Sequence, residues 1–173
     1  MASLALQSAT GVDIPNEQDS AVDDAEFERF LVKFERDWKS VGCVLRPSVV
    51  IRYNCHGFTF ASRRTWIDDS ALVPKILFED GFEQIKKTLD VLPGDVVVYF
   101  DQNGKAEHSG IVVEAPSSGT GLGIPRVVSK WAKAHEVVHW ANQCPYSVAD
   151  VRYYRVTRPT TKPNEQQRRI AIS

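Results

Sequence analysis

Two residues of this sequence, Cys55 and His108, have the types and positions for covalent chemistry. Cys55 lies in the run Tyr53-Asn54-Cys55-His56-Gly57-Phe58, and His108 opens the run His108-Ser109-Gly110-Ile111. A thiol beside an imidazole can lose its proton and attack a carbonyl carbon. The pair therefore indicates thiol-dependent acyl chemistry, with Cys55 as the nucleophile and His108 as its base.

A helix that begins near Cys55 would help this chemistry. Asn54 is a favourable helix N-cap, and the helix it starts is expected to carry Gly57, Phe58 and Phe60, with Arg63-Arg64 near its end. Free backbone N–H groups and the helix dipole at the first turn stabilise a thiolate and can bind an oxyanion. His56 points about 100° away around such a helix. We therefore expect His56 at the rim of the site, as a substrate contact.

The second half of the sequence has the two-residue periodicity of strands. A Leu-Pro-Gly-Asp turn at 92–95 precedes an apolar strand at 96–100, and Asn103-Gly104 is a strong hairpin signal before the strand that begins at His108. Three further strands are expected at 126–131, 136–140 and 151–156. Helices followed by strands predict an α+β class, with N-terminal helices packed on an antiparallel sheet of about five strands.

Domain boundaries follow from where hydrophobic periodicity begins and ends. Residues 1–20 lack it and are expected to form a flexible arm, as is the tail at 159–173, so one domain of residues 21–158 remains. Apolar residues from Phe27 to Val41 recur at helical spacing, which predicts a helix of about five turns. We expect its aromatic stripe to face the core, with docking of a partner as the alternative.

Composition excludes several classes of function. The 173 residues carry a formal net charge of −1, which disfavours nucleic acid and membrane surfaces as partners. The N-terminus has no basic region before its apolar residues, and no run of about 18 apolar residues occurs, so a cytoplasmic location is the default expectation. Three cysteines without CxxC spacing indicate neither a disulfide framework nor a zinc site. His135 and His139 lie in a strand-like run, so no metal pair is expected there.

These motifs resemble the NlpC/P60 superfamily of papain-like cysteine hydrolases, to which the CHAP amidases are related. The similarity covers about Tyr53 to Trp131. In that family Asp-Cys-Ser-Gly-Phe holds the nucleophile, and the present Asn-Cys-His-Gly-Phe matches it at Cys, Gly and Phe. The family strand Gly-Asp-Leu-Val-Phe matches 94–98, and His-Val-Gly-Ile matches His108 to Ile111. The Ser-Lys-Trp run at 129–131 and the later His139 also resemble bacterial relatives of the superfamily.

The resemblance implies a papain-like fold, cleavage of amide bonds through a thioester, and no cofactor or metal. The substrate it implies is a peptide or a peptidoglycan-like amide, with a protein substrate as another possibility. A third polar residue on the following strand orients the base in that family, and by register this is Ser129, with His139 as the alternative. The candidates for substrate contact or oxyanion binding are Tyr53, Asn54, His56 and Trp131.

Two other functions fit the same residues. Cys55 and His108 could support a related acyl transfer, such as transglutaminase-like or deamidase chemistry. The domain could also be a catalytically inactive papain-like module that binds a partner, because Ser129 is a weak orienting group for an imidazole. An enzyme acting on the cell wall or as an effector would need a specialised route to another compartment.

Overall fold

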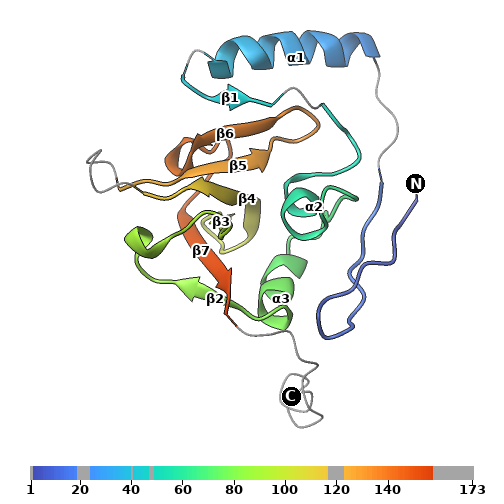
Figure 1. Ribbon diagram of the computed structural model, residues 1–173. Helices are drawn as coiled ribbons and strands as arrows, with labels where there is room; N and C mark the ends of the chain where they lie inside the picture. Colours follow the sequence, from blue (N-terminus) through green and yellow to red (C-terminus); the bar gives the residue numbers. More distant parts are fainter. Residues whose placement is uncertain (1, 19–23, 40, 47–48, 117–122, 158–173) are drawn as a thin grey trace.

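The computed structural model describes residues 2–18, 24–39, 41–46, 49–116 and 123–157. The fold is α+β, with helices beside a single antiparallel sheet (Figure 1). The helices are α1 (Asp24–Lys39), α2 (Cys55–Phe60) and α3 (Leu72–Glu79), and short 3-10 turns lie at Thr88–Asp90 and Ala141–Gln143. The strands are β1 (Val44–Leu45), β2 (Phe82–Ile85), β3 (Val96–Phe100), β4 (Ala106–Glu114), β5 (Arg126–Lys130), β6 (Glu136–Trp140) and β7 (Asp150–Val156).

The seven strands are ordered β1-β6-β5-β4-β3-β7-β2. The five expected strands form its continuous centre, and the sheet is larger than predicted because β1 and β2 extend its two edges. β1 is only two residues long, and β2 has the largely polar sequence Phe-Glu-Gln-Ile, so neither has the apolar alternation by which strands are recognised. Both are held by pairing, β1 with β6 and β2 with β7.

The β3–β4 hairpin lies at the centre of the sheet. All five residues of β3 are buried, as an apolar run between two covered faces requires. The turn at 101–105 is closed by hydrogen bonds between Asp101 and Lys105, and Gly104 has φ +78°, a conformation that favours glycine. The hairpin predicted from Asn103-Gly104 is confirmed, and its register places Tyr99 opposite His108.

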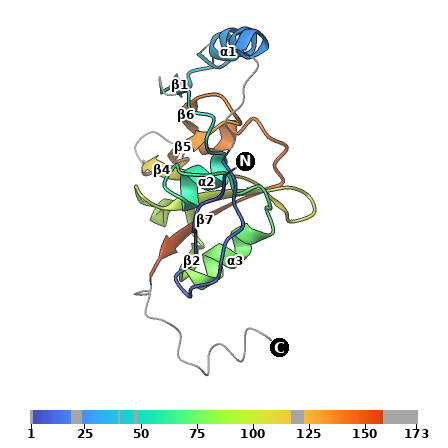
Figure 2. The ribbon, with the colours of Figure 1, turned by 90° about the vertical axis from the view of Figure 1, so that its right-hand side faces the viewer.

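Helices α2 and α3 cover one face of the sheet (Figure 2). From α3, Val73 and Leu77 pack on Val96 and Val98 of β3. From α2, Phe58 packs with Val128 of β5. The helix α3 was not predicted; Pro74 lies in its first turn, where no intrahelical N–H bond is lost.

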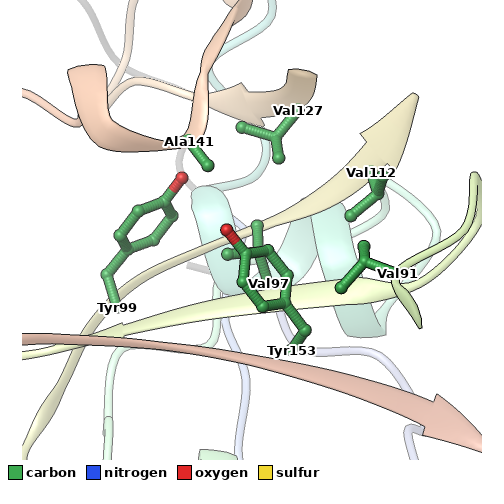
Figure 3. Packing of buried hydrophobic residues seen from close by; sticks show 7 residues of the cluster. All are labelled: Val91, Val97, Tyr99, Val112, Val127, Ala141 and Tyr153. Atoms are coloured by element: carbon green, nitrogen blue, oxygen red, sulfur yellow. The ribbon is translucent and has the colours of Figure 1, made fainter. Parts of the chain in front are cut away.

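The opposite face of the sheet is covered by loops, which pack on the strand residues that point away from α2 and α3. Its main apolar cluster is shown in Figure 3 and consists of Val91, Val97, Tyr99, Val112, Val127, Ala141 and Tyr153. Val97 and Tyr99 face this side while Val96 and Val98 face α3, which is the alternation of a strand buried on both faces. The segment 141–149 between β6 and β7 contributes Ala141 to this cluster.

The N-terminal residues differ from the expected flexible arm. Residues 2–18 form backbone bridges with one another and with Trp66, and Ile14 is buried against Ile67 and Ile76. The N-terminal residues therefore cover the apolar surface of α3 and of the chain before it. Their sequence has no hydrophobic periodicity from which this packing could be predicted. Residues 1, 19 and 20 of this arm and the tail predicted at 159–173 lie outside the described residues.

Helix α1 lies at one end of the molecule, beside β1 (Figure 1). Phe34 and Trp38 pack on Trp131, with ring centroids 5.8 and 4.5 Å away, so part of the aromatic stripe faces the core as expected. Phe30 and Val32 remain exposed. None of the helices in the described residues has the length and apolar character needed to cross a membrane.

Candidate active site

Cys55 is the first residue of α2, as the Asn54 cap predicted. The Asn54 side-chain oxygen accepts a hydrogen bond from Gly57 N–H at 2.9 Å. The same side chain exchanges hydrogen bonds with the backbone of Ile67, at 2.9 and 3.2 Å, and donates to Asp68. Asn54 therefore both starts the helix and ties it to the next loop, which fixes the position of Cys55.

Helix α2 is shorter than expected and ends at Phe60, before Arg63. Arg63 has φ +65° and reverses the chain, and its guanidinium binds Glu136 at 2.6 and 3.2 Å. A helix of six residues has a small dipole, so the stabilisation of a thiolate expected from a long helix is reduced here. Gly57 allows α2 to lie close to Thr65, because an added Cβ would be 1.6 Å from the Thr65 carbonyl oxygen.

Cys55 lies directly against β4, where it contacts Ser109, the residue that follows His108. The Ser109 hydroxyl is 3.2 Å from the Cys55 carbonyl oxygen and 3.0 Å from the Thr59 hydroxyl. One residue on, a Cβ at Gly110 would lie 2.6 Å from the Val128 carbonyl oxygen, so β4 and β5 meet more closely than a side chain allows. The tertiary structure thus brings the two sequence motifs together, through Cys55 and the residue adjacent to His108.

Burial decides the charge state of the Cys55 thiol. Desolvation raises its pKa to about 12, although the backbone N–H groups of Ser109, His56 and Cys55 itself act in the other direction. The Ser109 N–H is available to the sulfur because the paired part of the β4–β5 ladder begins at Gly110. In this conformation the thiol is protonated at neutral pH, and three backbone donors surround the position where a negative charge would form.

His108 is fully buried, and neither of its ring nitrogens has a hydrogen-bond partner among the described residues. Its neighbours are aromatic: the Tyr146 ring stacks on it at 4.5 Å and the Tyr99 ring lies 5.5 Å away. Burial lowers the pKa of the imidazole well below its usual value, and charge on His56 or His139 would lower it further. His108 is therefore neutral, and it makes no hydrogen bond to Cys55 in this conformation.

Ser129 and His139, the two candidates for the third catalytic position, hydrogen-bond each other. His139 Nδ1 is 2.8 Å from the Trp140 carbonyl oxygen, which can only accept, so Nδ1 carries the proton. His139 Nε2 then accepts a hydrogen bond from the Ser129 hydroxyl at 2.9 Å, and that hydroxyl accepts one from Trp131 Nε1 at 2.8 Å. The Ser129 proton is thus committed to His139, and neither residue hydrogen-bonds His108.

His56 lies inside the molecule, in contrast to the rim position expected for it. It is 4% exposed, and its Nδ1 is 2.9 Å from the Ser109 hydroxyl. Burial lowers its pKa to about 4, against opposing effects from the Ala106 carbonyl and from the charges of Glu107 and Asp68. The ring is therefore neutral and serves the contact between α2 and β4.

The remaining predicted contact residues are also buried. Tyr53 donates a hydrogen bond from its hydroxyl to Glu136 at 2.8 Å, and Trp131 is enclosed by α1 and the Ser129 hydroxyl. Burial of Glu136 acts to raise its pKa, but Arg63, Tyr53 and Arg46 outweigh it, so the pKa lies below the usual value. The four predicted contact residues are thus buried packing residues around the site, and none is exposed to solvent: Tyr53, Asn54, His56 and Trp131.

Histidine pairs do not converge on a metal position. His135 hydrogen-bonds Glu35 and the Arg46 carbonyl, at 3.0 and 2.9 Å, whereas His139 binds Ser129. Among the described residues, no group of three His, Cys, Asp or Glu side chains is arranged to hold a metal ion.

Sequence reasoning missed Tyr99, Tyr146 and Cys144. Tyr99 could have been found from the hairpin register, which places it opposite His108. Tyr146 and Cys144 lie in an irregular segment without periodicity, yet both are close enough to Cys55 for their charges to interact with it. No local pattern marks them.

Comparisons of this chain with models of known families, with curated proteins and with solved structures found no match. The function of the Cys55–His108 site therefore has to be inferred from its own residues.

Proposed function

We propose that this protein is a cysteine-dependent amide hydrolase of the NlpC/P60-like, papain-fold type, with Cys55 as nucleophile and His108 as base. The observation that carries the proposal is the fully buried imidazole of His108, unpartnered at both nitrogens and adjacent to the residue that binds the Cys55 backbone. Leaving a buried polar group unpaired costs about 1–3 kcal/mol. An unpaired buried group in a native structure therefore needs an explanation, and a catalytic role is one that fits an imidazole.

The reaction follows from these groups. His108 takes the proton from the Cys55 thiol, and the thiolate sulfur bonds to the carbonyl carbon of the substrate. Backbone N–H groups of Cys55 and His56 are suited to stabilise the oxyanion. The amine then leaves with the proton from His108, and the acyl group remains on the Cys55 sulfur as a thioester. Water then attacks the thioester, giving its proton to His108, and the acid and the thiol are released.

Substrate must open the site for this to occur. Tyr146 covers His108, and the buried Cys55 has a pKa of about 12. Displacement of Tyr146 would hydrate the thiol and lower its pKa, and would let His108 approach the sulfur. Catalytic hydrogen bonds that are absent without substrate often form only in its complex. No carboxylate or amide of the described residues hydrogen-bonds His108, so aromatic packing is the orienting contact that these residues provide.

The substrate class proposed is a peptide-like amide, in peptidoglycan or in a protein. The test is detection of an acyl-enzyme on Cys55 by intact-protein mass spectrometry after mixing with p-nitrophenyl acetate, followed by incubation with muropeptides, isopeptide-linked peptides and Gln-containing peptides. Acylation is expected in the native protein and in the matched thiol variant Cys43→Ser, and is expected to be lost in Cys55→Ser and reduced at least tenfold in His108→Gln.

The product distinguishes hydrolysis from acyl transfer. Release of a free acid from muropeptides or isopeptides is expected, whereas ammonia release from Gln peptides alone would indicate deamidation. Acylation of Cys43 and Cys144 to the same extent as Cys55 would contradict the proposal.

A second candidate is a catalytically inactive domain of the same fold. The observation that favours it is the state of the pair itself, a protonated buried thiol and an imidazole that do not hydrogen-bond each other. This candidate predicts that Cys55 reacts no faster with iodoacetamide than Cys144 does at pH 8, with or without the substrates above.

A further inference from the structure

A cavity of about 410 Å³ lies between β3 and the segment that joins β6 to β7. The residues that line it are Tyr99, Ala141, Asn142, Cys144, Tyr146, Val148, Ala149, Asp150 and Val151. Its volume is within the usual range for small-molecule sites, which is about 300–1,000 Å³. The cavity is large enough for a ligand the size of one or two amino-acid residues.

The Tyr99 hydroxyl is the unusual feature of this cavity. Tyr99 is fully buried, and its hydroxyl has no hydrogen-bond partner among the described residues. Figure 3 shows the Tyr99 hydroxyl directed toward Ala141, which also lines the cavity. Buried tyrosine hydroxyls are normally hydrogen-bonded. Because the Tyr99 side chain is 0% exposed, its hydroxyl can pair with a ligand only after the ligand displaces the side chains that separate it from the cavity.

The cavity and the candidate active site share two walls. Tyr146 lines the cavity and stacks on His108, and the Tyr99 ring lies 5.5 Å from the same imidazole. A ligand that entered the cavity and displaced the Tyr146 ring would therefore be next to His108. The two unpartnered buried side chains, Tyr99 and His108, would both be close to it.

The lining also selects the charge of a ligand. Among the described residues, no Lys, Arg or His lines the cavity, and the one charged residue there, Asp150, already pairs with Arg152 at 2.7 Å. An anion would therefore find no counter-charge in this described part of the lining. Ala141, Val148 and Val151 supply apolar contact, and Asn142 supplies an amide. An uncharged, moderately apolar molecule with a hydrogen-bond acceptor is the complementary class.

We propose that this cavity binds an uncharged amide-bearing group, with the Tyr99 hydroxyl donating a hydrogen bond to its carbonyl oxygen. The assignment of this group as the acyl side of the substrate rests on the proposed function. Binding of the group in the cavity is independent of the proposed function, because it needs no reaction at Cys55.

The test uses the full chain with Cys55→Ala, so that no chemistry takes place. The probes are N-acetyl-leucinamide and N-acetyl-alaninamide, and zwitterionic leucine is the charged control. Binding is measured by isothermal titration and by protection of the Cys144 thiol, which lines the cavity, from iodoacetamide. We expect both amides to bind and to slow Cys144 alkylation, and leucine to do neither.

Variants of two tyrosines then locate the hydrogen bond. Tyr99→Phe is expected to weaken binding of N-acetyl-leucinamide about fivefold to tenfold, which is the effect of one hydrogen bond. Tyr153→Phe is the matched control, because Tyr153 belongs to the same apolar cluster but does not line the cavity, and it is expected to leave binding unchanged. Thermal unfolding of each variant checks its folding. Tyr99→Phe removes an unpaired hydroxyl and should not lower stability.

Absence of binding by both amides, or equal affinity in Tyr99→Phe, would overturn the proposal. Its failure can be told apart from failure of the proposed function. Acylation of Cys55 with no effect of Tyr99→Phe on KM would reject the cavity as the acyl site and leave the hydrolase standing. Amide binding through Tyr99 without any acyl-enzyme would support the cavity as a binding site and reject the hydrolase.

Discussion

The Tyr146 ring stacks on the imidazole of His108, with 4.5 Å between ring centroids and 30° between the ring planes. The Tyr146 hydroxyl accepts a hydrogen bond from the Ala132 N–H at 3.1 Å, which holds the ring in place. Tyr146 is itself close to Cys55, since burial and the charge of a Cys55 thiolate both raise the pKa of its phenol. One side chain thus stacks on His108 and lies close to Cys55.

Removal of the Tyr146 ring is expected to activate Cys55. In Tyr146→Ala water reaches the thiol, and because burial is the main cause of its pKa of about 12, that pKa falls. Each unit of decrease raises the thiolate fraction at pH 8 about tenfold. The rate of Cys55 alkylation by iodoacetamide, followed by peptide mass spectrometry, should therefore rise at least tenfold. Tyr146→Phe keeps the ring and is the control. An unchanged rate in Tyr146→Ala would show that Tyr146 does not limit access.

Acid should destabilise the fold through the buried histidines His56, His108 and His139, because burial lowers the pKa of each. Burial lowers the pKa of His56 and of His139 from 6.5 to about 4. Between those values the unfolded chain binds protons that the folded chain does not, so the free energy of unfolding falls as the pH decreases. This contribution is fully present above about pH 6.5. His56 and His139 each account for a loss of about 3 kcal/mol by pH 4.

Urea unfolding at pH 7, 6, 5 and 4.5 measures this dependence. His56→Gln removes one titrating ring while leaving a side chain that can accept from the Ser109 hydroxyl, so its stability should decrease less steeply over the same range. Equal slopes for the variant and the native protein would show that His56 is not kept neutral by the fold.

Ser129 is expected to be structural. Ser129→Ala removes the hydroxyl that joins Trp131 Nε1 to His139 Nε2, and leaves two buried groups unpaired, so stability should fall by about 1–3 kcal/mol. The pH dependence of Cys55 alkylation should not change, because Ser129 makes no hydrogen bond with His108. A shift of that profile in Ser129→Ala, with folding intact, would instead assign Ser129 to the third catalytic position.

Gly57 should tolerate no side chain. In Gly57→Ala the new Cβ would overlap the Thr65 carbonyl oxygen, so α2 must move away from that loop and the unfolding free energy should fall by about 3 kcal/mol. Gly42→Ala is the control: that position has φ +82° but open space around it, so its cost is expected to be about 1 kcal/mol. Similar losses in both variants, measured by urea unfolding, would contradict close packing at Gly57.

Much of the central structure could be predicted because it is determined by neighbouring residues. Asn54 starts a helix through a bond to Gly57, three positions on, and Asn103-Gly104 closes a hairpin within five residues. The apolar run of β3 predicts burial on both faces. Asp95 bonds the Leu92 N–H at 2.7 Å, as a turn residue is expected to do. Each of these signals lies within a few residues of the structure it produces.

The environment of the candidate site is decided by contacts that are distant in sequence. Cys55 and Ser109 are 54 positions apart, and Tyr146 comes from a segment beyond two further strands. Ser129 points to His139 because the β5–β6 register places Val127 opposite His139 and so brings both side chains to one face. The sequence around Ser129 does not predict that its hydroxyl hydrogen-bonds His139 and not His108.

The sequence by itself determined the positions of Cys55 and His108, at the start of a helix and on a strand of a hairpin, because capping and alternation act over a few residues. Only the tertiary structure decided that both are buried and neutral, that Tyr146 stacks on His108 close to Cys55, and that Tyr99 and Tyr146, which contact His108, also line a cavity. The physical reason is that desolvation depends on every group packed around an atom, and the sheet brings those groups together from far along the chain.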